Sequence, residues 1–252
     1  MTGRASLSLA DQLAAAQDWW REAGVDCAFA DEPTRWLRDP AEEQAQTSSG
    51  APAPIPPPAA TQPPKPKASI GGDPASWPQD LASFSAWWLA EPSLETGGTQ
   101  PRIPPRGPAG AKLMILVPAP EAQDEDRLLS GPQGALLESF LAAAEVASGD
   151  VYLAAGLPRR TPLADMPALA EEGLGAVTLH HIALARPDRL LILGRDVLPL
   201  VGHDPTQNPV SLGEVNHGSG IVPAMVGRSL ELMLQRPATR SRFWRRWLDW
   251  TG

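Results

Sequence analysis

The stretch from Lys112 to Val146 places the strongest limits on what this chain can fold into. It begins with an apolar run, Leu113 to Val117, that has the length of a buried strand and is too short to cross a membrane. A loop with proline, acidic residues and glycine follows, and a helical pattern then places apolar side chains on one face. Those side chains belong to Leu136, Leu137, Phe140 and Leu141. Strand, loop and helix form the first unit of an α/β sheet, so we expect a ligand pocket in residues 118–134.

Apolar runs and helical patterns alternate through the remainder of the chain. Strands are predicted at 151–155, 189–194 and 221–226. Helices are predicted at 76–90, 167–184, 196–201 and from 229 or 237 to 250, with a Gly/Asn/Pro loop at 202–220. This alternation predicts an α/β protein with three layers, α/β/α, and a mostly parallel central sheet.

Proline divides the chain into three parts. It accounts for 29 of the 252 residues and crowds near 51–66, where extended, solvated backbone is favoured over a packed core. We therefore expect a Pro-rich disordered linker at 40–75, which tethers an N-terminal helical arm at 1–39 to the main domain. The main domain spans 76–252, and its core lies at 111–252.

The arm combines a predicted helix with much aromatic surface. The helix spans 6–23, and Ser8 with Asp11 resembles a capping box at its start. The arm's tryptophans are Trp19, Trp20 and Trp36. Tryptophan is enriched where proteins bind one another, so one interpretation is a docking peptide whose tryptophans contact a partner. The other interpretation is that the arm folds back on the main domain.

The composition excludes several classes of protein. A formal net charge of −8 argues against a protein that holds nucleic acid through its overall field. The single cysteine, Cys27, excludes an internal disulfide, a four-cysteine zinc site and a cysteine-held iron–sulfur cluster, and we expect no metal and no cofactor. The first residues lack the pattern of a signal peptide, and no apolar run is long enough for a membrane span. We therefore expect a bacterial-type, soluble, cytoplasmic protein without membrane contacts.

Five segments of the region 111–252 carry motifs in a characteristic order. They are 117–121, 126–137, 151–155, 187–194 and 222–230. The framework residues within them include Ala119-Pro120, Gly131, Gly134, Val151-Tyr152, Pro187, Leu193-Gly194 and Val222-Pro223. In this order they resemble the uracil-DNA glycosylase superfamily, particularly its bacterial iron–sulfur branch. The resemblance implies a uracil-DNA-glycosylase-like fold and a relation to DNA repair.

The positions that handle the base in that family carry other residues here. The place of the acid that positions the hydrolytic water falls on Pro118, and that of the aromatic that stacks on uracil falls on Leu129. The asparagine that reads the uracil edge corresponds to Ala155, and the final histidine corresponds to Ser229. All four positions have lost the family's chemistry, and the cluster cysteines are missing, so we expect uracil excision to be weak or absent.

Three other residues are weaker catalytic candidates. Glu121 and Asp124 lie in the acidic loop, where a displaced catalytic carboxylate is the functional interpretation and a solvated surface is the ordinary one. His217 lies in a Gly-rich loop near the expected pocket, although a lone histidine is more often structural or exposed.

Arginine gathers in the last 25 residues of the chain. One interpretation is a phosphate-binding surface that contacts DNA. Its residues would be Arg228, Arg236, Arg240 and Arg242. The other interpretation is a solvated helix face that covers the aromatic residues of the same segment.

The sequence therefore leaves three functions open. The first is a catalytically degenerate uracil-DNA-glycosylase-like protein that acts through DNA or protein contacts. The second is a non-enzymatic adaptor that docks on a replication or repair protein through residues 1–39. It has a precedent in the psi subunit of the bacterial clamp loader, described as having a similar fold without the chemistry and a terminal peptide that binds the loader. The third is an active glycosylase with a relocated catalytic acid.

Overall fold

The computed structural model describes residues 8–22, 69–95, 97–203 and 213–252. The chain divides into two compact units, Met1–Pro63 and Pro64–Gly252. Trp36 and most of the expected linker at 40–75 lie outside the described residues.

The described part of the first unit is the helix α1, which spans Leu9–Glu22. Its start confirms the predicted capping box. The Ser8 hydroxyl accepts a hydrogen bond from the Asp11 N–H at 3.2 Å, and the Asp11 carboxylate accepts one from the Ser8 N–H at 3.3 Å. The large apolar side chains of α1 are exposed, and they are Leu9, Leu13, Trp19 and Trp20.

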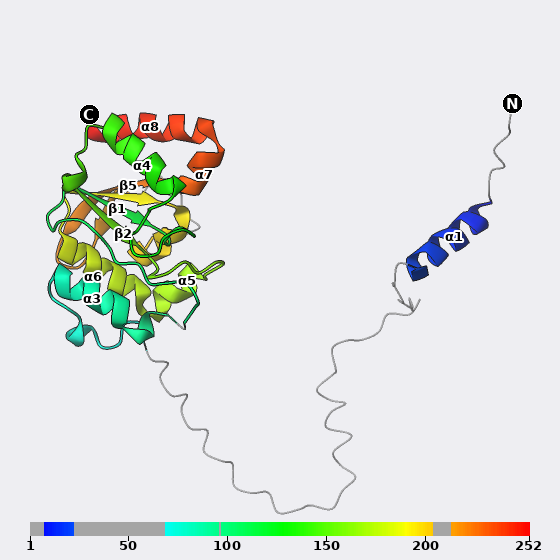
Figure 1. Cartoon of the computed structure of the whole chain (residues 1–252), viewed down its shortest axis with the longest axis horizontal. Helices are drawn as coiled ribbons and strands as arrows, with labels where there is room; N and C mark the ends of the chain where they lie inside the picture. Colours follow the sequence, from blue (N-terminus) through cyan, green and yellow to red (C-terminus); the bar gives the residue numbers. More distant parts are fainter. Residues whose placement is uncertain (1–7, 23–68, 96, 204–212) are drawn as a thin grey trace, which may run out of the picture. The chain divides into compact units, whose positions relative to one another are not determined.

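The second unit is built on a sheet in which the structure describes five strands (Figure 1). They are β1 (Leu113–Val117), β2 (Val151–Ala155), β3 (Arg189–Leu193), β4 (Glu214–Asn216) and β5 (Ile221–Gly227). Their order is β2-β1-β3-β5-β4; β4 pairs antiparallel with β5, and the other neighbours pair parallel. The predicted α/β class with a mostly parallel sheet is therefore confirmed.

Helices and short helical turns accompany the sheet. The α-helices described in this unit are α3 (Leu81–Ala90), α4 (Pro132–Ala143), α5 (Met166–Leu169), α6 (Gly175–Ala185), α7 (Leu230–Gln235) and α8 (Pro237–Thr251). The turns are η1 (Pro74–Ser76), η2 (Pro92–Leu94), η3 (Ser148–Asp150), the π-type η4 (Ala170–Leu174) and η5 (Arg195–Val201).

These helices cover both faces of the sheet, as Figure 1 shows for α4, α7 and α8 on one side and α3 and α6 on the other. The alternation of side chains along a strand explains the division. Leu113, Ile115 and Val117 of β1 pack in one hydrophobic cluster with α4, α7 and α8. Met114 and Leu116 pack in a second cluster with α6 and η5. Because both faces are buried, β1 is continuously apolar in sequence, which is why its ends could be predicted.

Two predicted helices have different ends in the structure. The helix expected at 76–90 begins only at Leu81, because the Asp80 carboxylate accepts the Ser83 N–H at 2.9 Å and caps it. The helix expected at 167–184 is broken by η4, where Gly173 has a φ of 126°. A Cβ at this glycine would also lie 2.7 Å from the Ile70 carbonyl oxygen, so close packing and backbone conformation both require glycine.

The segment 202–220 is not simply the predicted loop, since it contains β4. Only Val215 of this three-residue strand is buried. One apolar residue between two polar ones is too short a pattern to distinguish a strand from a loop in the sequence. The predicted C-terminal helix is two helices, α7 and α8, because the extended backbone of Arg236 interrupts it and Pro237 starts the second.

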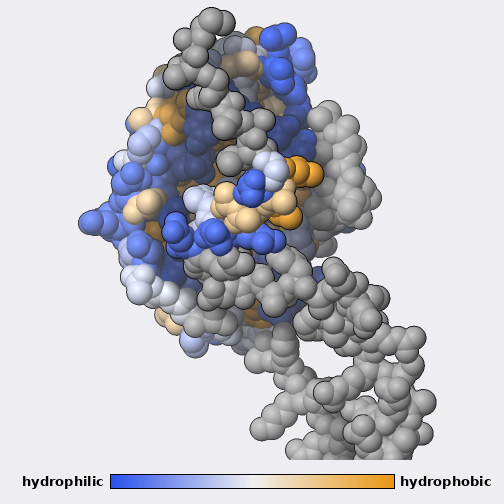
Figure 2. Space-filling model, turned by 90° about the vertical axis from the view of Figure 1, so that its right-hand side faces the viewer, coloured by the Kyte–Doolittle hydropathy of each residue, from blue (hydrophilic) through white to orange (hydrophobic). Residues whose placement is uncertain are grey.

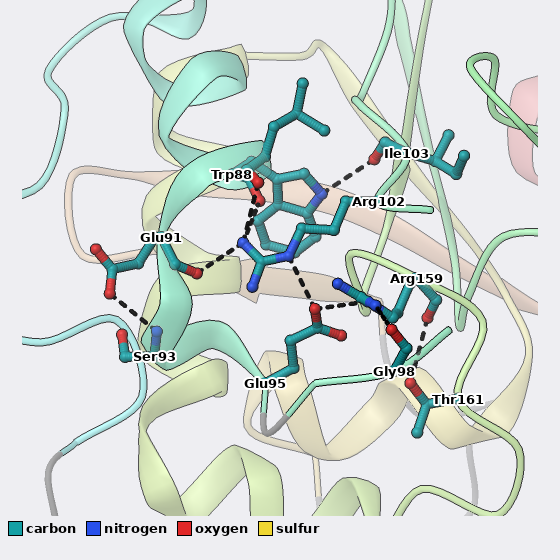
Figure 3. Close-up of polar contacts among 10 residues, drawn as sticks. Trp88, Glu91, Ser93, Glu95, Gly98, Arg102, Ile103, Arg159 and Thr161 are labelled. Atoms are coloured by element: carbon teal, nitrogen blue, oxygen red, sulfur yellow. Dashed lines mark hydrogen bonds and ion pairs between the residues drawn. The ribbon is translucent and has the colours of Figure 1, made fainter. Parts of the chain in front are cut away.

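The segment 91–111, which leads into β1, is tied to the domain by a partly buried charge network (Figure 3). The Glu95 carboxylate pairs with Arg102 at 2.8 Å and with Arg159 at 2.6 Å, and each of the three side chains is at most 15% exposed. The Arg102 guanidinium also donates to the carbonyl of Glu91 at 2.7 Å. Nearby, Arg106 forms an antiparallel bridge with Leu153 of β2. The segment therefore lies along the outer edge of β2.

Candidate functional site

An open cavity of about 460 Å³ lies where β1 and β3 end. From β1 the chain builds β2 on one side of it and then β3 on the other side. The order of the strands therefore reverses between β1 and β3, which makes this a topological switch point. Ligands of open α/β sheets bind at such switch points. We call this the switch cavity; its walls include Val117, Leu193 and the segments 118–123 and 160–162. The predicted pocket loop, residues 118–134, does contribute to it.

The four positions that correspond to base-handling residues do not all reach the switch cavity. Pro118 and Ser229 line it. Leu129 and Ala155 are buried in the hydrophobic cluster on the α4 side of the sheet and are not among the cavity's lining residues. Ser229 is also engaged in capping, because its hydroxyl accepts the Leu232 N–H of α7 at 3.3 Å.

Glu121 is buried, so the solvated-surface interpretation is wrong for this residue. Its two carboxylate oxygens accept the backbone N–H groups of Gln133 at 3.1 Å and Gly134 at 3.0 Å. These donors belong to the first turn of α4, whose N-cap is Gly131 and offers no side-chain acceptor. Glu121 therefore caps α4 from the preceding loop, where a negative charge also suits the helix dipole.

Asp124 is buried as well and organises the same loop. One carboxylate oxygen accepts the N–H groups of Glu121 at 2.8 Å and Leu129 at 2.9 Å. The other accepts the N–H of Ser130 at 2.7 Å and its hydroxyl at 2.8 Å. This arrangement holds Leu129 in a left-handed conformation with a φ of 56°. The hydrogen bonds of both carboxylates are thus committed to shaping the loop.

Two carboxylates that the sequence reasoning missed line the switch cavity. Asp196 follows β3 in η5, and Glu231 lies in the first turn of α7. Both side chains are exposed. The signal for Asp196 was its place three residues after the end of β3, at the edge where functional residues of α/β sheets gather.

A second cavity, of about 310 Å³, lies between β5, α7 and α8, and we call it the arginine cavity. Its lining contains five arginines: Arg195, Arg228, Arg236, Arg242 and Arg246. The remaining lining residues described there are Val226, Gly227, Leu232, Thr239 and Phe243, without an acid among them. None of the ion pairs found within the described residues involves these arginines. Arg246 donates one hydrogen bond, to the Val226 carbonyl at 2.8 Å.

The structure brings together three of the four arginines proposed as a phosphate surface and separates the fourth. Arg240 lines a different cavity on the neighbouring face of α8. We call it the apolar groove; it measures about 200 Å³, and its apolar lining is Leu136, Leu137, Phe140, Leu193, Leu230, Met233, Phe243 and Trp244. Arg195 and Arg246 take the place of Arg240 in the arginine cavity.

His217 lies away from the expected pocket. It belongs to the turn between β4 and β5, where its ring Nδ1 is 3.0 Å from the Ser219 hydroxyl. This turn precedes β5, whereas the switch and arginine cavities lie at the ends where the parallel strands finish. The prediction that His217 is near the pocket is therefore wrong.

On the face drawn in Figure 2, the described surface is mainly hydrophilic with smaller hydrophobic patches. Trp19 and Trp20 of α1 are both more than half exposed, with ring centroids 5.1 Å apart. Within the described residues, no group of three or more potential ligands could hold a metal ion. The helices described here are all too short or too polar to cross a membrane.

No protein-family model matches the chain, and a search of curated proteins finds no similar sequence.

Proposed function

We propose that this protein is a uracil-DNA-glycosylase-like protein with a three-layer α/β/α domain that has lost efficient uracil excision and acts by binding DNA. The observation that carries the proposal is the arginine cavity. Its five guanidinium groups share a concave surface, and the lining residues include no acid to neutralise them. Guanidinium groups match the oxygens of phosphate, and DNA offers phosphates in a regular array.

The chemistry of the switch cavity supports the loss of excision. Pro118 cannot transfer a proton, and Ala155 has only a methyl group and lies in the core. Glu121 and Asp124 accept backbone hydrogen bonds in the loop. The helix and loop contacts of the two carboxylates therefore fix their orientation.

Binding of a labelled oligonucleotide between about 50 and 200 mM salt tests the proposal. In the double variant Arg228→Ala, Arg242→Ala, the slope of log affinity against log salt should fall by about 1.4 for single strands or 1.8 for duplex, at about 0.7 or 0.9 per phosphate contact. The matched control is Arg127→Ala, Arg245→Ala, which removes the same charge from exposed positions outside the cavity. Equal slopes for the two variants would refute the arginine cavity as the DNA site.

A second candidate is an active glycosylase, which the exposed carboxylate of Asp196 in the switch cavity favours. An excision assay on single-stranded and duplex uracil DNA separates the two proposals. Turnover that Asp196→Asn abolishes and Asp188→Asn preserves would establish Asp196 as the relocated acid. Asp188 lies at the opposite end of β3 and serves as the matched control.

The adaptor function rests on a different observation, the exposed Trp19 and Trp20 of α1. A pull-down with the full chain and with a chain lacking residues 1–40 tests it. A partner that is lost on truncation and on Trp20→Ala would favour the adaptor. An unchanged set of partners would count against it.

A further inference from the structure

The helix α8 separates the arginine cavity from the apolar groove. Thr239, Arg242 and Arg246 recur at helical spacing and line the arginine cavity. Arg240 and Trp244, four residues apart, line the groove on the adjacent face. Phe243 lies between these faces and lines both cavities. The two cavities are thus neighbours with a shared wall.

The arginine cavity has further features that suit a phosphate. Thr239 lies in the first turn of α8, and its hydroxyl makes no hydrogen bond within the described residues. The N-cap residue of α8, Arg236, provides no side-chain acceptor for the first N–H groups of the helix. The positive end of the helix dipole therefore adds to the charge of the arginines.

The groove has the opposite chemistry, with aromatic side chains that the core only partly covers. Phe140 and Trp244 are half-buried, and their rings meet edge to face with centroids 5.9 Å apart. Phe140 also contacts Phe243, at 5.0 Å between centroids. Apart from Ser139 and Arg240, the lining is apolar. Such a surface can accept the flat face of an aromatic ring but cannot pair with the polar edges of a base.

We infer that these two cavities together bind single-stranded DNA, with a backbone phosphate in the arginine cavity and a neighbouring base stacked in the apolar groove. This inference rests on the proposed DNA-binding function and specifies its substrate. A basic surface beside aromatic side chains is how proteins hold single strands without reading sequence. In a duplex the bases are stacked and paired, so their faces cannot reach the groove. Arg240 at the groove suits the next phosphate along the strand.

Three ligands of equal length test the inference by fluorescence anisotropy: oligothymidylate, an oligomer of the same length with abasic sites throughout, and a blunt duplex. The abasic oligomer keeps every phosphate and lacks every base. We expect oligothymidylate to bind at least about fivefold more tightly than the abasic oligomer, because one stacked base is worth about 1–3 kcal/mol. The duplex should bind more weakly than oligothymidylate.

Variants of Trp244 test whether the base stacks in the apolar groove. Trp244→Leu keeps apolar bulk and removes the ring, so it should weaken oligothymidylate binding by about fivefold or more and leave the abasic oligomer unchanged. Trp244→Phe should stay within about threefold of the original affinity, since it keeps an aromatic face. The control is Trp250→Leu, on the same helix but outside the groove. Thermal unfolding of each variant checks that the fold is intact.

The outcomes separate the inference from the function on which it rests. If oligothymidylate and the abasic oligomer bind equally, the base does not enter the groove and the inference fails, while the DNA-binding proposal stands. If none of the three ligands binds, the proposed function fails as well. Sedimentation of the free protein tests whether a second copy of the chain occupies the groove instead. If the original protein is a dimer and Trp244→Leu is a monomer, the groove is a dimer interface and the inference is overturned.

Discussion

The loop between β1 and α4 and the arginine cavity use charged side chains in opposite ways. In the loop, Glu121 and Asp124 are buried and accept hydrogen bonds from backbone N–H groups. In the cavity, five arginines line the wall without an acid among the described lining residues. The first set of charges builds the structure, and the second set remains available to a ligand.

This difference changes which charged residues are the best candidates for binding a ligand. By sequence, the acidic loop follows the first strand and is the natural place for a catalytic group. In the structure, the carboxylates of Glu121 and Asp124 accept backbone N–H groups, whereas the arginines of the arginine cavity have no acid among the lining residues described there. Burial and hydrogen bonding therefore separate the charges that stabilise the loop from the charges that stay available to a ligand. The following predictions test that distinction through the free energy of unfolding.

The largest effect is expected for Glu95→Ala. It would leave Arg102 and Arg159, whose side chains are only 12% and 15% exposed, without their shared carboxylate, at a cost of about 3–5 kcal/mol. Urea unfolding measures it. The control is Asp150→Ala, which removes an ion pair to the exposed Lys112 and should hardly move the urea midpoint. Similar midpoints for both variants would contradict the structural role of Glu95.

Asp124→Ala should destabilise the domain by about 2–3 kcal/mol, because it leaves buried N–H donors without an acceptor. Asp126→Ala, at an exposed position of the same loop, should change the stability by less than about 0.5 kcal/mol. The same urea titration measures both. A mild effect of Asp124→Ala would return this residue to the list of catalytic candidates.

His181 should make stability depend on pH. It is buried against Phe84 and Trp88, and its ring lies 2.7 Å from the Tyr152 hydroxyl. Burial, and to a smaller degree the neighbouring His180, lowers the pKa of His181 from 6.5 to about 3. The folded state thus keeps His181 neutral where the unfolded state binds a proton. Above pH 6.5, His181 is neutral in both states and does not lower the free energy of unfolding. As the pH drops from 6.5 toward 3, the free energy of unfolding falls by about 1.4 kcal/mol per pH unit.

The variant His181→Gln isolates this contribution, since its amide can still bond to Tyr152 but does not titrate. Unfolding measured from pH 7 down to about pH 4.5 should show a steeper loss of stability in the original protein than in the variant. Identical slopes for the original protein and His181→Gln would show that His181 is not the responsible group.

The smallest effect on stability is expected in the arginine cavity. Arg228→Ala and Arg242→Ala remove exposed side chains, so each should change the free energy of unfolding by less than about 0.5 kcal/mol. Their effect should appear in DNA binding instead. A large loss of stability would mean that these arginines hold the fold together, and the contrast with the acidic loop would disappear.

Much of the fold was predictable because buried parallel strands have a simple pattern. β1 and β2 have the predicted ends, since both faces of each strand are covered and every residue is apolar or small. β4 was missed because only one of its residues, Val215, is buried. The late start of α3, at Leu81, depends on the Asp80 cap, which the sequence contains but which Pro78 obscured.

The residues of the arginine cavity could be predicted where their spacing along one helix determines which side chains share a face. Arg242 and Arg246 are four residues apart and therefore share a face of α8, whereas Arg240 is displaced to the next face. The addition of Arg195 depends on the pairing of β3 with β5, which residue spacing does not reveal. The role of Glu121 did have a local signal: α4 starts at Gly131-Pro132 and has no capping side chain of its own.

The bridge between Arg106 and Leu153 has a consequence for the protein at high concentration. An uncovered strand at the edge of a sheet offers its free N–H and C=O groups to other chains and so promotes aggregation. At the β2 edge, the Arg106 backbone both donates to and accepts from Leu153, at 2.9 and 2.7 Å. At the other end of the sheet, β4 is only three residues long. Among the residues that the structure describes, neither edge therefore presents a long template on which copies of the protein could assemble strand by strand.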